Sequence, residues 1–288
     1  MTPAPITVGI DGSDGALEAA RWAAAYARVT HTPLRVVHSM PDSEWYLGRV
    51  DYVPEQSLRD EFHALGRRHL DAAVDAIVEV DPSATVERVC TETPVASYLT
   101  GIESSLVVLG SVRTGPVRDL VLGGRTIRVL RHARCPVMIR RHEGDGSDEG
   151  LPVVVGYDGS PESDRAVLAA FEFAATVHVH LLVAHFWGVG VTVGAGMGAG
   201  YADWERIDRE ERRWVHDRVR PVQDKFPDVH VTVSSSSSSP AAGLRSLSSS
   251  SQLIVVGSRG RGKVTGMILG SVSQNVVHHA HCSVLVVR

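Results

Sequence analysis

Cysteines, membrane-length apolar runs and an excess of basic charge are scarce or missing in this chain of 288 residues. Its three cysteines are odd in number and have no pairable spacing, so disulfides are not expected and a reducing cytoplasm fits best. No apolar stretch approaches the roughly 20 residues of a membrane span, and the N-terminus has neither the basic nor the apolar part of a signal peptide. A formal net charge of −4 does not suggest a polyanion-binding surface. We therefore expect a cytoplasmic protein that has no membrane or nucleic-acid partner.

Metal-ligand patterns are missing as well. There are 14 histidines, but none forms an H-x-x-x-H pair or a Cys–His set with ligand spacing. Several histidines lie near expected helix C-termini, where the helix dipole favours them. The sequence therefore predicts no metal site.

What the chain does contain is a duplication. A shift of 147 residues places three segments of the first half on the second: Val8–Ser13 on Val155–Ser160, Leu106–Ser111 on Leu253–Ser258, and Arg131–Val137 on His278–Val284. A period of this length suits a whole small domain and not a solenoid repeat. We expect domains at residues 1–141 and 152–288, and the polar stretch between them makes residues 142–151 a linker.

Each copy alternates short β-branched runs with helical stretches, which is typical of βαβ crossovers and a mainly parallel sheet. Residues 94–104 are expected to be helical. The expected strands are residues 6–10, 33–38, 85–90, 106–109 and 137–140 in copy one, and 153–157, 179–185, 229–233, 253–256 and 284–287 in copy two.

Two stretches depart from this pattern. Gly188–Gly200 is rich in glycine but has no G-x-G-x-x-G register, so it is predicted to be a loop and not a phosphate site. Ser234–Ser239 and Ser248–Ser251 are homopolymeric, and by the repeat they fall on a strand end and a helix, where serine is a poor choice. One hypothesis is that some of these serines stand in for other residues, which peptide mass spectrometry would test. No site is placed there.

The strongest chemical signal is Gly257-Ser-Arg-Gly260, followed after nine residues by Gly270-Ser271. Gly257 ends a buried strand, and Gly260 and Gly262 are expected to adopt positive φ and bring backbone N–H groups toward an anion. Residues 270–273 open the next helix, whose free N–H groups, dipole and two hydroxyls would form a second anion-binding wall. Arg259, Arg261 and Lys263 add positive charge and could be either solvated or bound.

Asp158 lies at the carboxyl end of strand one of copy two, and Asp11 repeats it in copy one. A carboxylate at this position can accept hydrogen bonds from a ribose hydroxyl or an adenine amino group. The alternative is that Asp158 only caps the Asp-Gly-Ser turn.

A second motif overlaps the glycine loop. Gly257–Lys263 also matches G-x-x-x-x-G-K, the sequence pattern of the phosphate-binding loop in nucleoside triphosphatases. The next residue is Val264, however, so the hydroxyl that would ligate Mg²⁺ is missing. We favour the first interpretation.

Taken together, these motifs resemble the universal stress protein family in its tandem two-domain form, over about residues 5–141 and 152–288. The resemblance implies two doubly wound parallel five-stranded sheets of order 3-2-1-4-5, a Rossmann-like α/β fold of the nucleotide α-hydrolase type. It further implies that ATP, with or without Mg²⁺, lies in the crevice. Gly156, Asp158 and the backbone near Phe186 would then meet the adenosine, while Val272 and Ser273 would join the phosphate contacts.

Copy one departs from the family motif. Gly110 and Gly123 are kept, but Arg113 replaces the second glycine and Gly124 replaces the hydroxyl residue. A site built on Asp11, Gly110 and Gly123 is therefore expected to bind nucleotide more weakly than copy two, or not at all.

The resemblance favours an ATP-binding regulatory protein of the stress response and not an enzyme. A weak ATP hydrolase or an adenylating enzyme is the alternative, but the motif loops hold no positioned base and no S-G-G-x-D-S sequence. A partner-docking scaffold without nucleotide is a third reading, which the intact second motif disfavours. The terminal strands are apolar and could pair as sheet edges. The resemblance implies pseudo-symmetric pairing of the two halves, and a homodimer and an unknown protein partner are expected in addition.

Overall fold

The computed structural model describes residues 3–40, 55–111, 124–141, 150–187, 203–261 and 269–288. Its contacts divide the chain into unit 1, Met1–His142, and unit 2, Glu143–Arg288. The predicted linker lies mostly outside the described residues, and so does the predicted loop at 188–200. The pairing of the two halves and the homodimer stay predictions.

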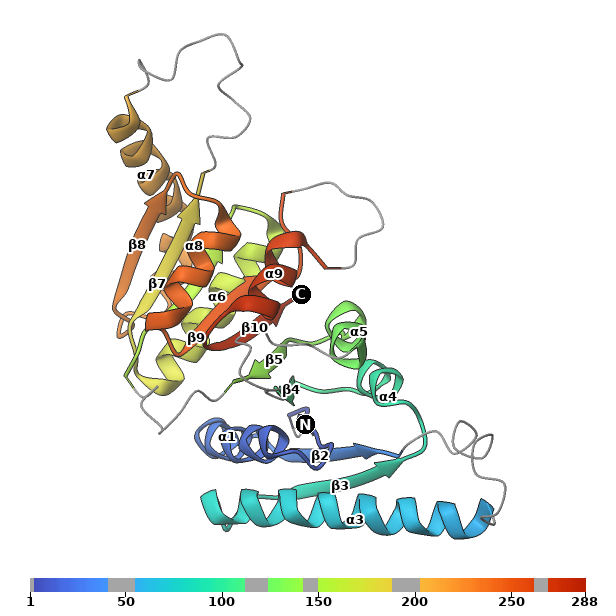
Figure 1. The fold of residues 1–288 in the computed structure, drawn as a ribbon. Helices are drawn as coiled ribbons and strands as arrows, with labels where there is room; N and C mark the ends of the chain where they lie inside the picture. The colour runs from blue at the N-terminus through green and yellow to red at the C-terminus, as the bar shows by residue number, and fades with distance from the viewer. Residues whose placement is uncertain (1–2, 41–54, 112–123, 142–149, 188–202, 262–268) are drawn as a thin grey trace. The chain divides into compact units, whose positions relative to one another are not determined.

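Within its described residues, unit 1 holds a parallel sheet of five strands in the order β3-β2-β1-β4-β5 (Figure 1). The strands are β1 (Ile6–Gly9), β2 (Leu34–Ser39), β3 (Val86–Thr91), β4 (Leu106–Gly110) and β5 (Val137–Arg140). The helices are α1 (Asp14–Thr30), α3 (Glu55–Val80), α4 (Val95–Gly101) and α5 (Gly124–His132).

Unit 2 repeats this arrangement in its described residues, with the parallel order β8-β7-β6-β9-β10. The strands are β6 (Val153–Tyr157), β7 (Leu181–Phe186), β8 (Val231–Ser236), β9 (Leu253–Gly257) and β10 (Ser283–Val287). The helices are α6 (Pro161–Val177), α7 (Trp204–Gln223), α8 (Pro240–Leu247), the short 3₁₀ helix η1 (Ser248–Ser250) and α9 (Ser271–His279). Both units therefore have the 3-2-1-4-5 order, and the α/β fold class is confirmed.

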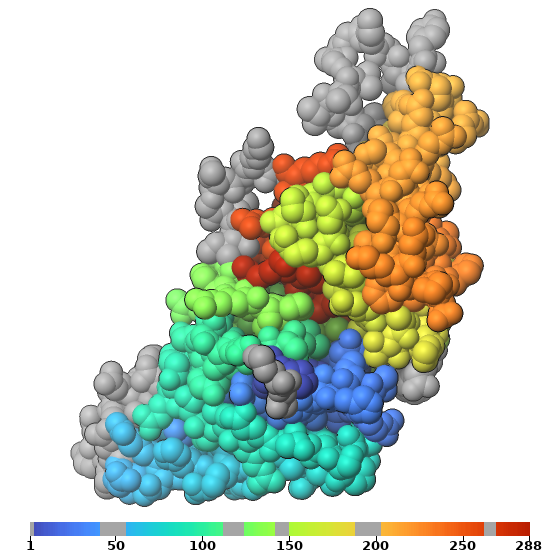
Figure 2. Space-filling view, turned by 180° about the vertical axis from the view of Figure 1, so that it is seen from behind, coloured from blue at the N-terminus to red at the C-terminus, as the bar shows by residue number. Residues whose placement is uncertain are grey.

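Helices cover both faces of each sheet. α1 packs on α3 and α4 on α5 in unit 1, and α6 packs on α7 and α8 on α9 in unit 2. The predicted small-residue face of α1 is buried, since Ala19, Ala20, Ala23 and Ala24 are fully inaccessible. The long helices α3 and α7 lie at the surface of their units (Figure 2), and α7 carries exposed pairs such as Arg206–Glu210 at 3.0 Å. No helix among the residues described is both long and apolar enough to cross a membrane.

The turn after the first strand has the same construction in both units. Ser13 and Ser160 cap α1 and α6 by accepting a hydrogen bond from the amide three residues ahead, at 3.2 Å in each case. The turn glycines have positive φ, +84° at Gly12 and +78° at Gly159, which a residue with a Cβ rarely adopts. The turn therefore needs both its glycine and its serine.

Several boundaries differ from the prediction, among them the ends of α4 and β8. The helix expected at 94–104 ends at Gly101, because the following residue, Ile102, is extended and the chain must reach β4, where the Ser105 amide bonds to Pro5 O at 3.0 Å. β8 continues through Ser236 although serine is a poor strand residue. There the Ser235 hydroxyl accepts a hydrogen bond from Trp187 Nε1 at 2.9 Å, which accounts for one polar side chain of the serine run.

Candidate functional site

A pocket of about 380 Å³ opens in unit 2, at the carboxyl ends of its strands. This volume lies within the range of roughly 300–1,000 Å³ that is usual for small-molecule sites. Four segments that are far apart in the sequence meet here: the ends of β6 and β7, the loop after β9 and the start of α9. All nine site residues predicted in copy two line the pocket: Gly156, Asp158, Phe186, Gly257, Gly260, Gly270, Ser271, Val272 and Ser273.

The start of α9 presents unpaired amides to this pocket. Gly270 is the N-cap residue and supplies no side-chain cap, and the first helical hydrogen bond runs from Gln274 N to Gly270 O at 2.9 Å. The amides of residues 271–273 precede that bond and so have no partner within the helix. Together with the positive end of the helix dipole, they make a site suited to an anion.

The Ser273 hydroxyl is engaged with backbone carbonyl groups of the protein. This hydroxyl donates to Gly270 O, at 2.9 Å, or to Ser258 O, at 3.1 Å. These contacts fix the helix start against the strand end. The exposed Ser271 is therefore the residue whose hydroxyl can face a ligand.

The positive φ expected at Gly260 is wrong, because the described glycines with positive φ are Gly12, Gly150 and Gly159. Gly260 is required for another reason, which is lack of room. A Cβ added there would lie only 2.5 Å from Asp158 Oδ2. Gly262 lies outside the described residues.

Asp158 ties the turn after β6 to the glycine loop. Its Oδ1 accepts hydrogen bonds from the Ser160 amide at 3.0 Å and the Ser160 hydroxyl at 2.6 Å. Its Oδ2 accepts one from the Arg261 amide at 3.0 Å. Burial alone would raise the pKa of Asp158, but these hydrogen bonds together lower it, so the group is a carboxylate at neutral pH. The capping role is therefore present, and one lone pair of Oδ2 is still available for a ligand hydroxyl.

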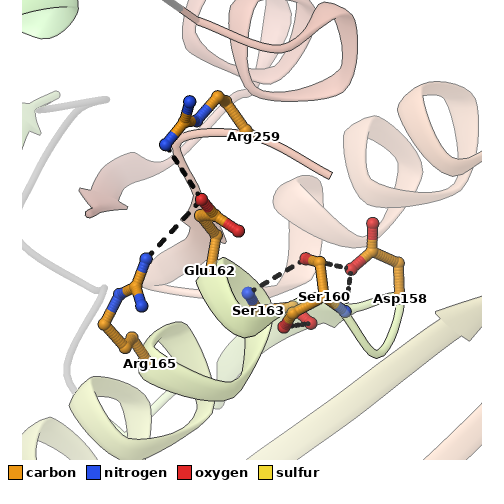
Figure 3. Close-up of polar contacts among 6 residues, drawn as sticks. All are labelled: Asp158, Ser160, Glu162, Ser163, Arg165 and Arg259. Carbon is orange, nitrogen blue, oxygen red and sulfur yellow. Dashed lines mark hydrogen bonds and ion pairs between the residues drawn. The ribbon is translucent and has the colours of Figure 1, made fainter. Parts of the chain in front are cut away.

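Both arginines of the loop have partners inside the unit. The Arg261 guanidinium lies 5.1 Å from the ring centroid of Trp214, a residue of α7. Arg259 contacts Glu162 on α6, with 3.1 Å between Nη2 and Oε1 (Figure 3). Both side chains therefore contact the protein, one on each side of the loop, and Lys263 lies outside the described residues.

Several lining residues were not foreseen. Tyr157, Ser163, Pro240, Leu244 and Val256 complete the pocket walls. Pro240 and Leu244 belong to α8, which follows the serine run and carries no motif. Tyr157 donates a hydrogen bond to Asp164 Oδ1 at 2.9 Å, and burial together with this carboxylate raises its pKa to about 12. Tyr157 is therefore a neutral wall of the pocket.

His185 also lines the pocket, and a protein oxygen lies near each of its ring nitrogens. Nδ1 lies 2.8 Å from Tyr157 O, and Nε2 lies 3.3 Å from Glu211 Oε2. His38 repeats the first contact in unit 1, at 2.8 Å from Ile10 O. The repeated histidines thus bind strand one to strand two. The residues that the structure describes contain no group of three histidine, cysteine or acidic side chains placed to hold a metal ion.

The predicted site of copy one is only partly described. Asp11 accepts from the Ser13 amide at 3.0 Å and from its hydroxyl at 2.6 Å, as Asp158 does from Ser160. Gly110 ends β4 and touches the backbone of Gly15 in the first turn of α1. Gly123 and Arg113 lie outside the described residues, so the site predicted in copy one stays a prediction.

A histidine pair stands beside the turn of copy one. His69 of α3 packs on Gly12, in the place that Trp214 takes on Gly159. Its ring centroid lies 4.9 Å from that of His38, and neither His38 Nε2 nor His69 Nδ1 has a hydrogen-bond partner. Burial lowers the pKa of His69, and the neighbouring His38 lowers it further although Asp11 opposes the change.

We therefore expect unit 1 to lose stability as the pH falls through about 6.5, the ordinary pKa of histidine. With a lowered pKa, the folded state binds fewer protons than the unfolded state in this range, so the free energy of unfolding decreases on acidification. A histidine NMR titration should give His69 a midpoint below that of a free imidazole, with His69→Gln as the assignment control. A midpoint at or above the free value would contradict this.

Comparisons with known proteins agree with the duplication. The Universal stress protein family model matches residues 4–141 and again residues 151–288. A universal stress protein of Mycobacterium tuberculosis is 34% identical over 293 residues, covering 98% of this chain and 96% of the relative. One from Mycolicibacterium smegmatis is 32% identical over 292 residues, with the same two coverages.

The fold also matches a solved structure. The crystal structure of a universal stress protein from Archaeoglobus fulgidus covers 100% of this chain and 97% of its own, with a TM-score of 0.70 and 18% sequence identity. At this identity the match shows the fold alone. The two family matches and the mycobacterial relatives decide the family, and the chain belongs to the universal stress protein family as a tandem of two family domains.

Proposed function

We propose that unit 2 binds an adenine nucleotide, ATP first of all, and that the chain acts as a regulatory protein of the stress response. The strongest support is that the nine residues predicted from the sequence all line one pocket. Unpaired amides of a helix start and a carboxylate at a strand end are the groups that such a ligand requires. The homodimer and the protein partner belong to the same proposal.

The two ends of the pocket suit different parts of the nucleotide. Gly156, Phe186 and Asp158 line the pocket at the carboxyl ends of β6 and β7, and they suit the base and a ribose hydroxyl. The loop after β9 and residues 270–273 form the other end, where backbone amides suit phosphate oxygens. Since Asp158 is the only carboxylate among the described lining residues and is already engaged, Mg²⁺ would be held by the phosphates and water.

The proposal does not include catalysis. Hydrolysis would need a base that positions water. Among the described lining residues, His185 has a protein oxygen near each ring nitrogen, and Asp158 already accepts three hydrogen bonds. ADP formation is therefore expected to be slow.

The test is to identify what the purified protein carries. Denaturation of the full chain should release an adenine nucleotide that mass spectrometry identifies. Stripped protein should bind ATP in a calorimetric titration, with a stoichiometry of one if unit 2 alone binds.

GTP serves as the matched control, because it differs in the base but not in the phosphates. Absence of ATP binding at millimolar concentration would overturn the proposed function. ADP release at rates typical of enzymes, on the order of 1 s⁻¹ or faster, would instead favour a hydrolase.

A further inference from the structure

A charged corner distinguishes the unit 2 pocket from the equivalent place in unit 1. The charged corner consists of Glu162, Arg165 and Arg259. Glu162 Oε1 lies 3.1 Å from Arg259 Nη2 and 3.6 Å from Arg165 Nη2, so one carboxylate stands between two guanidinium groups (Figure 3). At the equivalent positions copy one has Gly15, Glu18 and Val112, so its sequence cannot form the same corner.

Arg259 belongs to both the pocket and the corner. It lines the pocket, and its backbone lies against the start of α9, where a Cβ added to Gly270 would come within 3.3 Å of Arg259 Cα. Its side chain is 59% exposed and is held at its end by Glu162. Rotation of this long side chain can therefore turn the guanidinium from Glu162 toward an anion at the helix start, while the backbone stays in place.

Glu162 keeps a cationic partner when Arg259 moves away. Its side chain is 15% exposed, and a carboxylate so nearly buried is costly to leave unpaired. Arg165, three residues further along α6, still faces it. Glu162 also lies in the first turn of α6, where the helix dipole favours negative charge. The loss of one of two cationic partners is thus tolerable.

We propose that Glu162 and Arg259 exchange counter-ions and thereby make the pocket prefer nucleotides that carry several phosphates. The inference rests on the proposed nucleotide function and adds a ligand class to it. A terminal phosphate offers Arg259 more negative charge and more acceptor oxygens than one carboxylate does. Adenosine offers neither, so Arg259 stays with Glu162 when adenosine binds. Glu162 is therefore a competitor that a polyphosphate displaces.

The experiment titrates the stripped full chain with adenosine, AMP and ATP. Glu162→Gln should increase the affinity for ATP about fivefold, the scale of a partly exposed ion pair, and should leave the affinity for adenosine unchanged. Arg259→Gln should weaken ATP binding about tenfold, the scale of one charge-assisted hydrogen bond. The double variant should bind ATP as Arg259→Gln does, because no guanidinium is left to be released.

Each other result has a defined meaning. A gain that persists in the double variant would indicate long-range repulsion by Glu162 and overturn the exchange. Glu205→Gln is the matched control, since Glu205 is also a first-turn acid but is 90% exposed on α7. An equal gain there would show a mere net-charge effect and also overturn it. If the wild type and Glu162→Gln bind ATP equally, the counter-ion exchange is overturned but the proposed nucleotide function is not. If the wild type binds no ATP, the proposed nucleotide function is overturned as well.

Discussion

Gly260→Ala is expected to weaken ATP binding while the chain remains folded. The added Cβ would lie 2.5 Å from Asp158 Oδ2, so either the carboxylate or the loop must move. Either movement breaks the hydrogen bond from the Arg261 amide at 3.0 Å and shifts two pocket walls together. A lost hydrogen bond to a charged group is worth about 2 kcal/mol, which corresponds to roughly thirtyfold in affinity. Calorimetric titration measures the loss, and circular dichroism checks the fold.

Two further variants sharpen this result. Gly101→Ala is the matched control, because its added Cβ meets nothing within 4 Å and Gly101 belongs to unit 1. Asp158→Asn keeps an oxygen for Ser160 but turns the Arg261 contact into two facing donors, so it should resemble Gly260→Ala. Wild-type affinity in both Gly260→Ala and Asp158→Asn would show that this end of the pocket does not hold the nucleotide.

Gly110→Ala is expected to destabilise unit 1 strongly. Its added Cβ would overlap the carbonyl group of Gly15 and lie 2.6 Å from Ala16 N. These are backbone atoms in the first turn of α1, and they cannot move without shifting the buried alanine face of that helix. We expect a loss of about 3 kcal/mol in the free energy of unfolding, the upper end for overpacked sites. Hydrogen exchange of β1, α1 and β4 measures it, with unit 2 as the internal reference.

The same substitution at Gly124 provides the comparison. Gly124 opens α5, and a Cβ there meets nothing within 4 Å. Gly124→Ala should be neutral or slightly stabilising, because alanine is the better helix residue. Equal protection in Gly110→Ala and wild type would mean that β4 and α1 are less tightly packed than described.

The strand pattern and the glycine motif predicted the fold and most of the pocket. Parallel strands end at one edge of a sheet, so Asp158, Phe186 and Gly257 had to approach one another once their strands were recognised. The hydrogen bond from Arg261 to Asp158 joins residues 103 positions apart. No spacing rule predicts such a contact. The sequence therefore suggested positive φ as the reason for a glycine at position 260, whereas the reason is the lack of space beside Asp158.

The pocket wall from α8 was missed for a different reason. Pro240 and Leu244 are ordinary apolar residues of a short helix, and nothing in their types marks them as lining a site. Only the packing of α8 against β6 and β7 brings them there. The inward hydrogen bonds of Ser273 were likewise invisible, since a serine near a helix start serves a ligand and a backbone carbonyl equally well.

The close contact of Gly110 with Gly15 also limits how the two halves can be recombined. Unit 2 has Glu162 where unit 1 has Gly15, and there a Cβ added to Gly257 would lie 2.9 Å from Glu162 C. Grafting the Gly257–Arg261 segment into unit 1 would bring in Arg259 where Gly15 takes the place of its partner Glu162. It would also place that segment against the first turn of α1, where Gly15 has no side chain to contact it. An engineer who wishes to exchange the loops must therefore exchange the first helical turns with them.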